Sequence, residues 1–69
     1  SYRLVIEYRT PTGTHQRVVY QPDSAGLGWL RREDVYDPES DAWRARGREQ
    51  IQAPTVTVEP TRGRSFAGP

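Results

Sequence analysis

The sequence predicts an all-β fold: a small antiparallel sheet of about five strands, formed by two hairpins and a C-terminal edge strand. Two observations support this prediction. Short segments rich in β-branched and aromatic residues alternate apolar and polar positions, which is typical of strands with one buried face. Clusters of Gly, Pro, Asp and Ser separate these segments at short intervals, as turns do. The pattern leaves open whether the sheet curls into a partly open barrel.

The first hairpin is predicted from turn chemistry and pattern together. Pro11 suits the first central position of a type I turn, and Gly13 suits the left-handed residue that follows it. The loop then pairs the segments on either side so that Leu4 lies opposite Tyr20. In this register the apolar residues of both segments coincide and Glu7 lies opposite an arginine, whereas a slip of one residue would lose both matches.

The stretch "VYDPESDAWRARG", residues 35–47, allows two interpretations. Asp37 and Pro38 could begin a short helix that ends at Gly47. Such a helix would be marginal, because it has about nine residues and a poor apolar stripe. Alternatively, "PESD" forms the loop of a second hairpin, in which Tyr36 pairs with Trp43 across the strands. We favour the hairpin.

A short resemblance supports the same choice. The residues "VYDPESDAW" resemble the inner hairpin of a single kelch repeat, in which a Tyr-Asp-Pro run precedes a Trp. Tyr36 and Trp43 have the spacing of that motif. The resemblance implies a hairpin at this point and extends no further along the chain.

The second hairpin would gather arginines on one face. Its register places Arg44 opposite Val35, Arg46 opposite Glu33, and Arg48 opposite Arg31. Only the last of these pairs is unfavourable, because it joins like charges. The predicted face therefore combines four arginines with Trp29 nearby.

The C-terminal part is predicted to contain one more strand. Thr55–Val58 are strong strand formers between two prolines, which is typical of a short edge strand. We expect a single domain over residues 1–60 and a flexible tail over residues 61–69. The predicted core residues are Leu4, Ile6, Val18, Tyr20, Leu30, Tyr36, Trp43, Ile51, Val56 and Val58.

Composition argues against most kinds of catalytic or metal site. The chain has no cysteine and only one histidine, His15, so disulfides, thiolate zinc sites and His-rich sites are excluded. No group is positioned to hold that histidine as the base of a nucleophilic triad. We therefore expect a non-enzymatic protein without cofactor or metal. No apolar run approaches the roughly 20 residues of a membrane span, so we expect no membrane partner and a cytoplasmic location.

The expected function is that of a small protein-interaction module or accessory subunit. It would bind a protein partner, or a second copy of itself, through an aromatic and arginine-rich sheet face or through an open edge strand. The alternative is a nucleic-acid-binding module that uses the arginine face, although a net charge of +1 argues against strong non-specific binding. The candidate contact residues are Trp29, Arg31, Arg44, Arg46, Arg48, Arg62, Arg64 and Phe66.

Overall fold

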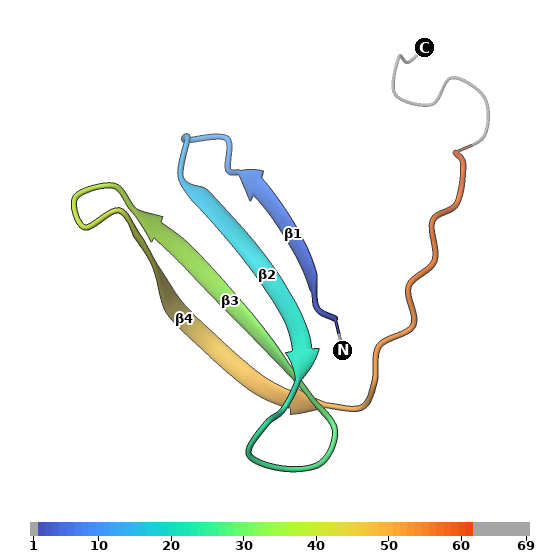
Figure 1. Ribbon diagram of the computed structural model, residues 1–69. Helices are drawn as coiled ribbons and strands as arrows, with labels where there is room; N and C mark the ends of the chain where they lie inside the picture. The colour runs from blue at the N-terminus through green and yellow to red at the C-terminus, as the bar shows by residue number, and fades with distance from the viewer. Residues whose placement is uncertain (1, 62–69) are drawn as a thin grey trace.

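The computed structural model describes residues 2–61, and in them the chain forms one antiparallel sheet of four strands (Figure 1). The strands are β1 (Leu4–Arg9), β2 (His15–Pro22), β3 (Trp29–Asp37) and β4 (Ala42–Ile51), and they lie in the sheet in chain order. The predicted all-β fold is confirmed. The sheet is open rather than closed into a barrel, with β1 and β4 at its two edges.

The first hairpin has the predicted register, with Leu4 opposite Tyr20 and Glu7 opposite Arg17. The Thr10 amide donates a 2.9 Å hydrogen bond to the carbonyl oxygen of Thr14, which closes the loop. Gly13 has a φ of 92°, a left-handed conformation that costs glycine little. Turn chemistry therefore fixes how β1 and β2 align.

Residues 35–47 form a hairpin and not a helix. Tyr36 lies opposite Trp43, as predicted. In the loop, the Asp37 carboxylate accepts a 3.0 Å hydrogen bond from the Glu39 amide and a 2.9 Å hydrogen bond from the Ser40 hydroxyl. The side chain that could have capped a helix thus stabilises a turn instead.

The predicted register of this hairpin is wrong beyond Ala45, because β4 contains a β-bulge. Asp34 pairs with Ala45, but Glu33 pairs with Gly47, so that Arg46 has no partner on β3. The bulge shifts every later pair by one residue. As a result Arg31 lies opposite Glu49 and not opposite Arg48, which replaces a like-charge pair by an attractive one.

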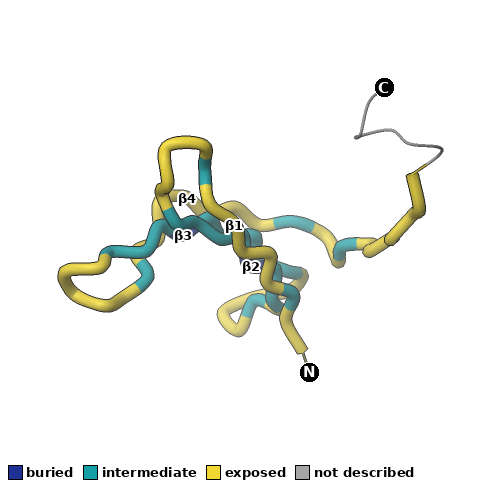
Figure 2. The backbone as a smooth tube through the Cα atoms, turned by 90° about the horizontal axis from the view of Figure 1, so that it is seen from above, coloured by how far each residue is buried: buried dark blue, intermediate teal, exposed yellow. Residues whose placement is uncertain are grey.

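The burial of the two faces of the sheet differs from the prediction, which assigned Ile6 and Val18 to the core. We call face A the side with Ile6 and Val18, and face B the side with Val5 and Val19. Within the described residues only Val19 and Asp34 are buried, and both lie on face B. Figure 2 shows how much of the backbone is exposed or intermediate.

Several predicted core residues are therefore wrong. Ile6, Val56 and Val58 are 51%, 60% and 91% exposed. The alternation of apolar residues correctly indicated two faces, but residues 2–61 form no second sheet or helix that packs on face A. On face B, by contrast, Val19 is fully buried between its ladder partners Val5 and Arg32.

Thr55–Val58 is not a strand in the structure, and residues 52–61 pair with none of the four strands. Pro54 and Pro60 have no amide hydrogen, so a ladder could not extend beyond either end of this short segment. After β4 the chain passes to the side of the sheet on which β1 lies (Figure 1). Residues 54–57 line a shallow hollow of about 230 Å³ together with Leu4, Ile6 and Tyr20 of face A.

Candidate functional site

The predicted arginine face does not form, because the arginines are divided between different parts of the sheet. Arg31 lies on face A, where it donates a 2.8 Å hydrogen bond to Glu33 and lies 3.7 Å from a Glu49 oxygen. Its guanidinium carbon is 6.0 Å from the centre of the Tyr20 ring. Hydrogen bonds with Tyr20 and Glu33 raise its pKa further, so this arginine is part of a local polar network.

The remaining predicted arginines lie apart from Arg31. Arg44 is held at the loop of the second hairpin by a 2.9 Å hydrogen bond to Asp37, whose pKa this bond lowers. Arg46 is exposed in the bulge. Arg48 is also exposed and lies opposite Arg32 on face B.

Trp29 lies at the start of β3 and is half-buried. Its ring meets the Tyr2 ring edge-on at a centroid distance of 5.6 Å. The other candidates, Arg62, Arg64 and Phe66, lie outside the described residues.

Face A carries a row of exposed and half-buried apolar side chains across β1 and β2, which we call the apolar stripe. Its most exposed members are Ile6 at 51% and Tyr8 at 44%. The Tyr8 hydroxyl donates a 3.0 Å hydrogen bond to Gln16, which holds the Tyr8 ring in place within the stripe. The stripe consists of Leu4, Ile6, Tyr8, Val18 and Tyr20.

The outer edge of β1 adds a row of backbone hydrogen-bonding groups to this surface. Thr10 and Thr14 form a hydrogen-bonded pair, and such pairs alternate with non-hydrogen-bonded ones along an antiparallel ladder. The residues of β1 that bond to β2 are therefore the even-numbered ones. The amides and carbonyls of Val5, Glu7 and Arg9 point to the open edge.

Face B carries a cluster of three rings near the hairpin loops. The centroid of the His15 ring lies 5.6 Å from that of Tyr36 and 4.9 Å from that of Trp43. The rings of Tyr36 and Trp43 meet at 5.4 Å. The guanidinium carbon of Arg17 lies 4.4 Å from the centre of the Trp43 ring, a cation–π distance.

Asp34 binds two arginines of face B, Arg17 and Arg32. Its carboxylate accepts hydrogen bonds of 2.8 Å from Arg17 Nε and of 2.8 Å from Arg32 Nε. Burial alone would raise the pKa of Asp34, but the hydrogen bonds and charges of the two arginines outweigh it and lower the pKa. The buried charge is thus fully paired and has a structural role.

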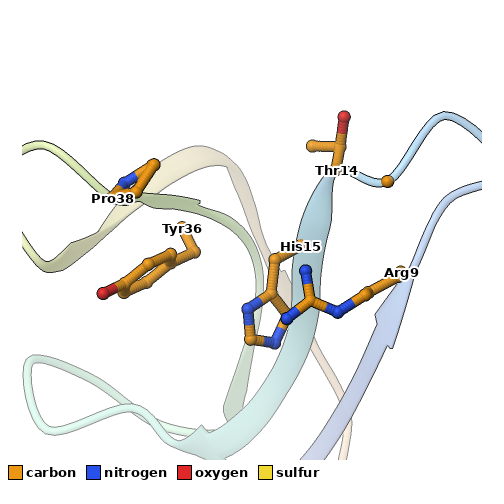
Figure 3. Close-up of a pocket in the computed structure, with 6 residues that line it drawn as sticks. Arg9, Thr14, His15, Tyr36 and Pro38 are labelled. Carbon is orange, nitrogen blue, oxygen red and sulfur yellow. The ribbon is translucent and has the colours of Figure 1, made fainter.

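A hollow of about 430 Å³ opens beside the ring cluster, between the two hairpin loops. In Figure 3 the His15 ring lies between Tyr36 on one side and the guanidinium of Arg9 on the other. The His15 Nε2 atom contacts the Glu7 carboxylate. Among the residues that the structure describes, no three His, Asp or Glu side chains are grouped as metal ligands.

Comparison with known proteins identifies no relative. The chain matches no family model, and it is similar to no curated protein and to no solved structure with which it was compared. In residues 2–61 there is no helix long and apolar enough to cross a membrane. The evidence for the candidate site therefore comes from the geometry of the sheet and its side chains alone.

Sequence reasoning missed the apolar stripe as a site, because it assigned four of its five residues, all except Tyr8, to the core. The signal was present in the surplus of aromatic residues, which included Tyr2 and Tyr8. It also missed the position of His15 against Tyr36 and Trp43, because that contact joins β2 to the second hairpin across the sheet.

Proposed function

We propose that this chain is a non-enzymatic protein-interaction module that docks through the apolar stripe and the open edge of β1. The observation that carries the proposal is the exposure of Ile6 and Tyr8 in the stripe, on a four-stranded sheet to which residues 2–61 add no second sheet or helix. Aromatic and aliphatic side chains beside unpaired backbone groups are what a partner strand or sheet requires.

Photo-crosslinking at Ile6 tests the proposal. Benzoylphenylalanine at position 6 should give a crosslinked product of higher mass in cells that express the chain. The matched control is the same substitution at Leu27, a loop residue that is 95% exposed and lies outside the stripe. Equal yields at both positions, or no product at position 6, would contradict docking through the stripe.

A second candidate function, nucleic-acid binding, is supported by face B rather than by the predicted arginine face. Arg9 and Arg48 share face B with the ring cluster, and within residues 2–61 neither of them forms an ion pair. Alternating arginines and rings are suited to a single strand. Fluorescent single-stranded DNA and RNA should then bind at 50 mM salt, weaken steeply at higher salt, and lose affinity with Trp43→Ala. No binding at 50 mM salt removes this candidate.

A further inference from the structure

The two edges of the sheet are protected to different degrees. β4 contains the bulge at Arg46, the glycine at position 47 and a row of charged, exposed residues. Bulges and charges are the devices by which natural sheets prevent edge pairing. β1 has a regular register along its whole length, with no bulge and no proline. In the described residues the edge at β4 is therefore protected against strand pairing, whereas the edge at β1 is open to it.

We propose that the open edge of β1 pairs with β1 of a second copy of this chain, antiparallel and across a two-fold axis perpendicular to the sheet. This inference rests on the proposed function and names its partner. The two sheets would become one continuous sheet, with the apolar stripes of both copies adjacent on face A. A self-complementary strand is what such an isologous contact requires.

The direction of the backbone amides and carbonyls of β1 restricts the register of this contact. Only the odd-numbered residues of β1 direct their amides and carbonyls outward, so odd positions must pair with odd positions. Three central registers satisfy this condition. They place Val5, Ile6 or Glu7 on the two-fold axis beside the same residue of the second copy.

Charge selects one of the three registers. With Glu7 on the axis, two carboxylates oppose each other, and with Ile6 on the axis, Arg3 opposes Arg9 of the second copy. With Val5 on the axis, Arg3 opposes Glu7 of the second copy, and this attraction occurs twice because of the symmetry.

The side chains of face A agree with the register centred on Val5. Leu4 then lies opposite Ile6 of the second copy, and Tyr2 lies opposite Tyr8. Tyr2 is 73% exposed and Ile6 is 51% exposed in the isolated chain. Aliphatic and aromatic cross-strand pairs of this kind stabilise antiparallel ladders. Residues 54–57 line a hollow together with Leu4, Ile6 and Tyr20, and they pair with no strand, so that β1 remains an edge strand.

A cysteine scan of three positions tests both the contact and its register, since the chain has no cysteine of its own. In a hydrogen-bonded pair the Cα atoms are about 5.5 Å apart, within reach of a disulfide. Under mild oxidation Val5→Cys should form a covalent dimer fastest, ahead of Ile6→Cys and Glu7→Cys. Leu27→Cys, at an exposed loop position, serves as the control for random collision.

Charge reversal tests the same register by an independent measurement. Arg3→Glu and Glu7→Arg should each raise the dimer dissociation constant in sedimentation equilibrium by roughly tenfold, and the double variant should restore it. Glu39→Arg makes the same charge change at an exposed loop position and should leave the dimer unchanged. Recovery in the double variant also shows that the single variants weaken the contact and not the fold.

The outcomes separate this inference from the proposed function. If the wild-type chain remains monomeric at millimolar concentration, or if no β1 cysteine crosslinks faster than Leu27→Cys, the dimer is overturned. Fastest crosslinking at position 6 or 7 overturns the register. If position 6 then crosslinks only to a different protein, the interaction module stands without the dimer, whereas no crosslink to any protein defeats both.

Discussion

Arg17 on β2 and Asp34 on β3 lie directly opposite each other, and Arg17 Nε donates a 2.8 Å hydrogen bond to the Asp34 carboxylate. Asp34 is 2% exposed, and next to it Val19 is fully buried. The best-shielded part of the described sheet therefore includes a charged group beside an apolar one. Its stability depends on keeping this carboxylate ionised.

Acid should destabilise the chain through Asp34. The pKa of Asp34 is lowered in the folded state, below its ordinary value of 3.8. Its contribution is therefore complete above about pH 4 and is lost as the pH falls through the folded pKa. Urea unfolding followed by circular dichroism between pH 2 and 7 measures this slope. A stability that does not decrease below pH 4 would contradict the assignment.

The variant Asp34→Asn should be less stable by about 2–3 kcal/mol at pH 7, because two half-buried arginines lose their counter-charge. The same variant should show a shallower loss of stability below pH 4. Part of the slope should remain, since the pKa values of Asp23 and Asp37 are lowered too. Glu39→Gln, which neutralises an exposed loop carboxylate, is the control and should behave as wild type.

Two glycines provide a matched pair for the turn geometry. Gly13→Ala should cost about 1 kcal/mol, because Gly13 has a φ of 92° that alanine adopts with strain. Gly47→Ala should be neutral or stabilising, because Gly47 lies in a strand with no positive φ and no atom within 4 Å of an added Cβ. Thermal unfolding of both variants measures the difference. Equal losses would contradict the turn assignment.

The two tryptophans should differ in their contribution to stability. Trp43→Ala should cost about 2–3 kcal/mol, because Trp43 packs against His15, Tyr36 and the guanidinium of Arg17. Trp29→Ala should cost less, because its one ring contact within the described residues is with the exposed Tyr2. Urea unfolding of the two variants compares them directly, and a larger loss for Trp29 would count against the ring cluster as a stabilising element.

The sequence by itself determined the four strands of the sheet, the two hairpins and the register of the first hairpin. These features follow from local causes: φ restrictions at Pro11 and Gly13, and side chains that alternate between faces with a period of two residues. The pairing of Tyr36 with Trp43 was predictable for the same reason, since only a short loop separates them.

Only the tertiary structure decided which face is shielded, where β4 bulges and whether Thr55–Val58 joins the sheet. Whether a face is buried depends on whether another layer of structure packs on it. The alternation of apolar and polar residues along a strand contains no information about such a layer. The bulge at Arg46 depends on which residues of β3 lie opposite β4, because it shifts the pairing so that Arg31 lies opposite Glu49. The arginine face inferred from sequence was lost at this point, because one unpaired residue moved Arg48 to the opposite side of the sheet.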